Sequence, residues 1–174
     1  MQTNTNYTKM KYDPLIDYGE TDLSLENNLT YWKFSELIKI LIIISSKAEK
    51  QIEYIGIGAA ADEMAIDFDT YYTLLVQSYI EYNLISFAQK EKLDELDRYF
   101  EIRGGNNNPD FWDDCKLGTN PEWETARQKA QEILVLLGRE NLTIEYDRKE
   151  EYNKNNKLTM QWTKIKLIDK TPLS

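Results

Sequence analysis

The chain is rich in carboxylates but has few of the other side chains on which enzymes rely. It contains 30 Asp and Glu residues, no histidine and one cysteine, Cys115. Within this chain, the lack of histidine excludes serine–histidine and cysteine–histidine nucleophile pairs, together with histidine-ligated zinc and haem. A single cysteine excludes an internal disulfide and a multi-cysteine metal site. Carboxylate chemistry, lysine chemistry and binding without chemistry remain.

The carboxylates are concentrated in a stretch that has no basic residue. Residues 51–89 contain six carboxylates and five tyrosines but no lysine or arginine. Residues 152–174, by contrast, carry five lysines and one aspartate, so the rest of the chain is more acidic than the net charge of -9 suggests. An acidic surface attracts cations or basic proteins and repels nucleic acid. We therefore expect a basic protein partner and no nucleic-acid partner, although acidity can also serve solubility alone.

Two clusters form the candidate partner-binding site. The first is an expected helix start, where Glu63 and Asp67 are four residues apart and share a face that suits a hard cation or a partner's lysine. The second is the loop 110–114, where an exposed Phe–Trp pair would anchor an interface. The alternatives are a solvated helix start and burial of Phe111 and Trp112 in the core. The candidate residues are Asp62, Glu63, Asp67, Asp69, Asp110, Trp112, Asp113 and Asp114.

Other patterns in the chain do not form a recognisable catalytic or ligand-binding motif. Gly56, Gly58 and Ala61 have the spacing of a dinucleotide loop after a β-like segment, 52–55. The carboxylates that follow would repel phosphates, and no repeated βαβ pattern follows. We interpret this segment as a flexible turn.

Residues 106–110 resemble the start of a calcium loop, but Phe111 and Leu117 stand where the loop needs a glycine and a carboxylate. Cys115 lies beside two aspartates and lacks an activating positive charge, so it should be a poor nucleophile. We expect no metal, no cofactor and no catalytic residue.

Apolar spacing and capping residues predict four main helices. Thr30 is the expected cap of the first helix and Asp62 that of the second. Ser86 and the pair Asn120-Pro121 mark two further starts. The isoleucine-rich run 40–44 makes the first helix central, although β-branched residues also favour a strand there. The expected helices are 31 to the late forties, 62–83, 87–103 and 121–137.

After Gly138 the apolar period changes from helical to two, which predicts a β-hairpin with a turn at 153–156. Along the second strand the apolar residues switch from one set of alternate positions to the other, which predicts a bulge near Thr163 or Lys164. Because a lone hairpin is marginally stable, it should pack on the helices or pair with a third strand near 52–57.

These elements predict an α+β fold that is a mostly helical single domain, residues 1–174, with a C-terminal antiparallel β-hairpin. Residues 1–28 should be irregular. The longest apolar run is too short to span a bilayer, and the first residues have no apolar core of a secretory signal. We expect a cytoplasmic protein with no membrane partner.

Three segments, 56–72, 107–114 and 120–138, together resemble a family of small acidic bacterial proteins that accompany polymorphic or contact-dependent toxins as immunity proteins. The resemblance covers about two thirds of the chain, residues 54–146. It implies a cytoplasmic, non-catalytic protein that binds and neutralises a cognate toxin. Because immunity proteins differ widely in fold, it assigns no functional residue.

Two other function classes fit the composition. One is an acidic nucleic-acid mimic that blocks a DNA-binding protein. The other is a carboxylate-dependent hydrolase, for which two carboxylates need a separation of roughly 5–9 Å. A duplex-like spacing of surface charge would favour the mimic, and a deep pocket with convergent carboxylates would favour the hydrolase.

Overall fold

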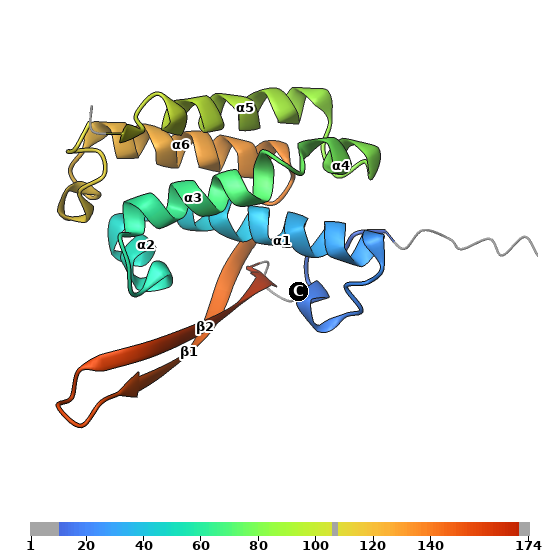
Figure 1. Cartoon of the computed structure of the whole chain (residues 1–174). Coiled ribbons are helices and arrows are strands. Elements are labelled where there is room, and N and C mark those ends of the chain that lie inside the picture. The colour runs from blue at the N-terminus through green and yellow to red at the C-terminus, as the bar shows by residue number, and fades with distance from the viewer. Residues whose placement is uncertain (1–10, 106–107, 171–174) are drawn as a thin grey trace, which may run out of the picture.

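The computed structural model describes residues 11–105 and 108–170 as a helical body with a hairpin that extends away from it (Figure 1). The prediction of a mostly helical α+β fold with a C-terminal antiparallel hairpin is confirmed. None of the described helices is long and apolar enough to cross a membrane. The elements are α1 (Glu26–Ser45), α2 (Ala48–Ile55), α3 (Ala60–Tyr72), α4 (Val76–Glu81), α5 (Phe87–Glu101), α6 (Pro121–Leu136), β1 (Leu142–Tyr152) and β2 (Leu158–Asp169).

Helix α1 is the centre of the body. It packs against α3 and α6 and also contacts both strands. Its run 40–44 is buried in full, so the alternative reading of that run as a strand is wrong. A helix that is apolar on nearly all sides is stable when neighbours cover every side, and this burial outweighs the strand preference of isoleucine. The helix begins at Glu26 rather than Tyr31, and Thr30, the expected cap, lies inside it, where its hydroxyl donates to the Glu26 carbonyl.

Residues 11–25 are irregular up to the start of α1, apart from a short 3-10 helix, Tyr18–Glu20. Tyr12 and Tyr18 bury their rings against α1, where Tyr12 lies within hydrogen-bond distance of the Ser35 hydroxyl, 3.0 Å away. The part of the predicted irregular segment that spans residues 1–10 lies outside the described residues.

The predicted helix 62–83 is two helices, α3 and α4, with a break at 73–75. The Tyr79 hydroxyl donates to the Tyr71 carbonyl at 2.6 Å and fastens α4 to the end of α3. As the apolar spacing indicates, Tyr72 and Tyr79 are buried in the core, and Tyr71 is half-buried.

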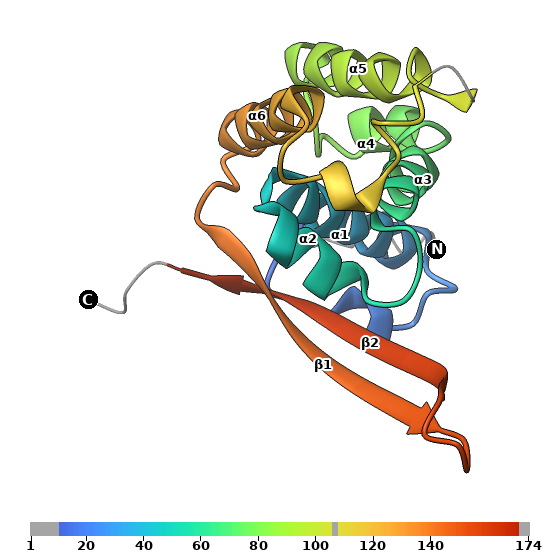
Figure 2. The ribbon, with the colours of Figure 1, turned by 90° about the vertical axis from the view of Figure 1, so that its left-hand side faces the viewer.

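Helices α5 and α6 begin where the sequence indicates. Ser86 and Gln89 form a reciprocal capping box at the start of α5. The Asn120 side chain accepts the Glu122 amide at the start of α6. The two helices lie side by side over α1 and α3 (Figures 1 and 2).

The hairpin pairs Ile144 with Leu167 and Tyr146 with Ile165, and the register is regular across Thr163 and Lys164. The predicted bulge there is wrong, because the one register shift lies at Glu151/Tyr152, beside the turn. The apolar residues switch between alternate positions for another reason. Near the helical body the apolar side chains of the strands face the helices, whereas farther out Met160 and Trp162 lie on the opposite, exposed face of the hairpin.

No third strand is present in the described residues, and the segment predicted to supply it belongs mostly to α2. The end of α2 instead holds the hairpin through side chains. Arg148 donates to the carbonyls of Glu53 and Tyr54, and the Tyr146 hydroxyl donates to the Glu53 carboxylate. The Gln161 side chain accepts the Ile57 amide. Of the two predicted ways to support the hairpin, packing on the helices is therefore the one observed, and the third strand is not.

Candidate functional site

The two predicted acidic clusters lie next to each other. The Asp114 carboxylate accepts the backbone amides of Ala60 and Ala61, at 2.8 and 2.9 Å, and so caps α3 from the loop. Asp62 was the expected cap, but it lies within the first turn of the helix. The contact brings the 110–114 loop to the start of α3, and both clusters therefore belong to one region of the surface.

The loop carboxylates are engaged within the protein. Asp110 forms an ion pair with Lys116, and Asp113 accepts the Cys115 amide as the cap of a 3-10 helix, Asp114–Lys116. Together with the contacts of Asp114, these bonds give the loop carboxylates a structural role.

Phe111 and Trp112 have different environments. Phe111 is fully buried and stacks on Trp123 with ring centroids 4.7 Å apart. Trp112 is half-buried, and its indole N–H donates to the Arg103 carbonyl at 2.6 Å. Phe111 is therefore a core residue, whereas Trp112 combines a structural hydrogen bond with a partly exposed ring.

A groove between α3, the end of α5 and the Trp112 loop is the most distinctive surface of this region. It consists of two adjoining hollows of about 680 and 440 Å³ that share Ala65, Ile66, Gly104 and Trp112. Ile66 is 57 % exposed and lies among the exposed and half-buried residues of α3, so its side chain is open to the groove. The carboxylates that line the groove are Asp62, Asp69, Asp97 and Glu101.

No lysine or arginine lines this groove. Within residues 11–105 and 108–170, its four carboxylates form no ion pair, which is also true of most of the other acidic residues there. Burial, followed by the negative charges of Asp69, Glu101 and Asp94, raises the pKa of Asp97. The groove therefore combines an apolar floor with negative charge that the protein does not neutralise.

Of the predicted residues on α3, only Asp62 and Asp69 line the groove. Asp67 lies towards α1, where burial and the charges of Glu63 and Glu36 raise its pKa. Sequence reasoning missed Asp97 and Glu101 on α5. Their spacing of four residues places both on one helix face, but nothing in the sequence indicates that this face borders α3.

The groove offers carboxylates, the Thr73 hydroxyl and apolar side chains. It contains no serine, cysteine, lysine or histidine among its lining residues. In the described part of the chain, no group of three or more Asp, Glu, His or Cys side chains is arranged to hold a metal ion. Comparison with family models, with curated proteins and with solved structures finds no match to this chain.

Proposed function

We propose that the protein is a non-catalytic inhibitor that binds and neutralises a basic protein, as a bacterial immunity protein does with its cognate toxin. The observation that carries the proposal is the groove of α3 and α5, which four carboxylates without ion pairs line together with the exposed Ile66 and the half-buried Trp112. Under this proposal the protein acts in the cytoplasm and needs no cofactor.

The charge of the groove supports a basic partner. A partner with a positive surface gains long-range attraction, which raises its association rate. Burial first, and then repulsion from Asp69, Glu101 and Asp94, raises the pKa of Asp97, and a lysine or arginine that enters the groove would relieve that repulsion.

The apolar floor supports a long-lived complex. Tryptophan is common among the residues that carry most of the binding free energy, and Trp112 stands at the meeting point of the two hollows. Lysine and arginine have apolar stems that can lie along such a floor while their charged ends reach the carboxylates.

The direct experiment is a pull-down with the tagged protein from cells that also express the gene adjacent to the one that encodes this protein. We expect one basic protein to be retained, and we expect its activity to be lost in the complex. The variant Asp69→Lys/Asp97→Lys should retain much less of it. The matched control is Glu132→Lys, which reverses an exposed carboxylate on α6 that forms no ion pair in the described residues.

Equal retention by both variants would remove the groove from consideration. Turnover of a small substrate by the isolated protein, with no partner retained, would favour the carboxylate hydrolase. Competition by duplex DNA for the same partner surface would favour the nucleic-acid mimic.

A further inference from the structure

The outer edge of β2 is not paired with another strand in the described residues, because the sheet consists of β1 and β2 alone. The Lys170 amide donates to the Asn141 carbonyl at 2.8 Å, and these two residues continue the register of the hairpin. In an antiparallel pair, hydrogen-bonded residues alternate with residues whose N–H and C=O groups point away from the partner strand. The backbone groups of Thr163, Ile165 and Leu167 therefore point to the free edge.

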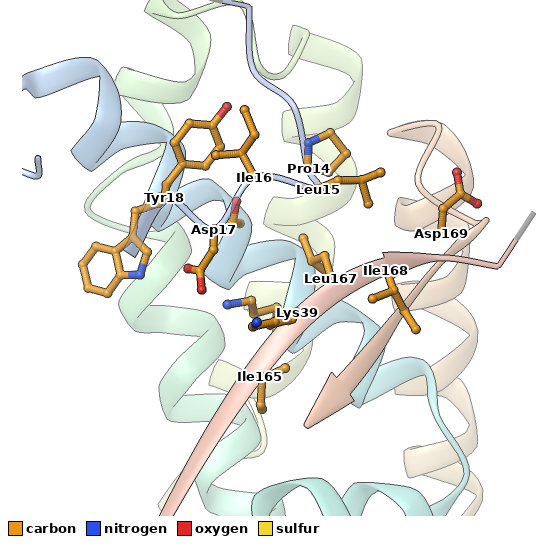
Figure 3. A pocket seen from close by; sticks show the side chains of 13 residues that line it. Pro14, Leu15, Ile16, Asp17, Tyr18, Lys39, Ile165, Leu167, Ile168 and Asp169 are labelled. Carbon is orange, nitrogen blue, oxygen red and sulfur yellow. The ribbon is translucent and has the colours of Figure 1, made fainter. Parts of the chain in front are cut away.

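A cavity of about 330 Å³ lies along this edge, between β2, α1 and residues 14–18 of the N-terminal segment. Figure 3 shows Leu15 and Ile16 on one side and Leu167 and Ile168 on the other. Leu15 is 53 % exposed, so the cavity opens to the surface with an apolar wall.

The N-terminal segment does not pair with β2 through its backbone. The Ile16 and Tyr18 amides donate to carbonyls within the segment, and the Leu15 amide donates to the Asp13 side chain. Lys164, which is not among the residues that line the cavity, forms ion pairs with Asp17 and Glu20 of this segment. The cavity beside β2 thus has free backbone donors and acceptors on its β2 side and an apolar surface on the side of the N-terminal segment.

We propose that an extended segment of a partner protein adds to the free edge of β2 as a third strand and places an apolar side chain in this cavity. Strand addition of this kind draws its affinity from backbone hydrogen bonds and its specificity from pockets for alternate side chains. The apolar residues of the segment would face the cavity beside Leu167, and the residues between them would lie on the opposite face.

The charge of that opposite face indicates which segment fits. Lys164 and Lys166 lie on it, and Lys166 forms no ion pair with a described residue. Opposite charges on neighbouring strands attract and like charges repel. A segment that alternates apolar and acidic residues is therefore favoured. A second copy of β2 is disfavoured because it would bring lysines against lysines, a common protection of edge strands.

The inference does not rest on the proposed function, since it concerns a surface on the other side of α1. The probe is a blocked heptapeptide of alternating leucine and glutamate, and the matched probe has lysine in place of glutamate. Amide hydrogen exchange is measured by NMR on the full chain. At ten times the dissociation constant, the acidic peptide should slow exchange at Ile165 and Leu167 by about tenfold. The amides of Lys164 and Lys166 already bond to β1 and serve as the internal reference.

The variant Lys166→Glu should transfer this protection from the acidic to the basic peptide. Lys149→Glu is its control, because it reverses a charge on the same face of β1, away from the free edge. No protection by either peptide at millimolar concentration, or equal protection by both, would overturn the proposal. Protection of the same amides in the protein alone, with a dimer in sedimentation, would assign the edge to a second copy and would also overturn it.

Discussion

Asp114 accepts two backbone amides at the start of α3, and through them it fixes the loop against the helix that carries the acidic groove. Its replacement by alanine leaves both amides without their partner. We expect Asp114→Ala to lower the free energy of unfolding by about 1–2 kcal/mol, the usual cost of a lost helix cap. Asp110→Ala, which removes an exposed ion pair with Lys116, should cost less than about 1 kcal/mol. Urea denaturation checks both values, and equal costs would contradict the capping role.

Replacement of Asp97, in contrast to that of Asp114, should raise the stability of the protein. Burial and neighbouring carboxylates raise the pKa of Asp97 in the folded protein, so the folded state holds its proton to a higher pH than the unfolded state does. The unfolded chain then binds fewer protons, and stability falls as pH rises from the ordinary aspartate range through the raised pKa. Asp97→Asn should therefore be more stable than the parent at neutral pH. The difference should disappear below the ordinary aspartate pKa of about 3.9.

Thermal unfolding across this pH range measures the difference, with Asp22→Asn as the control. Hydrogen bonds from Ser24 lower the pKa of Asp22, so its replacement should not stabilise the protein at neutral pH. A constant gain for Asp97→Asn at every pH would show that the ionisation of Asp97 in the folded protein is not its cause.

At the scale of elements, the attachment of the hairpin to α2 depends on Arg148, which donates to the Glu53 carbonyl at 2.5 Å. Hydrogen bonds from a charged donor contribute about 1.5–3 kcal/mol, which corresponds to tenfold or more in an opening equilibrium. In Arg148→Ala, amide exchange in the ladder of β1 and β2 should accelerate by about that factor while α1 stays protected. Lys149→Ala is the control, since its side chain lies on the opposite face. A uniform acceleration would mean that the hairpin and the helices open together.

Local signals identified the elements that have strong caps or strong periodicity. The starts of α5 and α6 and the turn of the hairpin follow from residues such as Ser86 and Asn120, which act on their own neighbours. The break between α3 and α4 depends on tertiary contacts such as that of Tyr79 with Tyr71, and spacing alone does not encode them. The wrong prediction of a bulge has a similar origin. Apolar residues can change from one face of a strand to the other because the exposure of the faces changes, without any change in strand geometry.

In the candidate site, too, the features of contiguous residues were predictable and the features that arise from helix packing were not. Composition located the basic-free stretch that contains Asp62 and Asp69, because that property belongs to contiguous residues. The carboxylates of α5 enter the groove through the packing of two helices that are separated in sequence. The apolar part of the groove was likewise not predictable, because the sequence does not distinguish the exposed Ile66 from a buried core residue of an amphipathic helix.

At the scale of the whole molecule, charge is divided between two surfaces. The groove of α3 and α5 is acidic and free of basic residues, whereas the outer face of β2 carries lysines. Each surface has its own apolar contact, Trp112 in one and the cavity beside Leu167 in the other, and under the two proposals each would meet a partner of opposite charge.

The most direct test of the proposed inhibitor is the association rate with the captured basic partner at low and at physiological ionic strength, measured by stopped flow. Electrostatic steering predicts a rate that falls steeply as salt is added. Asp69→Lys/Asp97→Lys should lower the rate at low salt by tenfold or more and flatten its salt dependence, while Glu132→Lys should change little. An association rate for the double variant that equals the parent's at both ionic strengths would contradict the role of the groove.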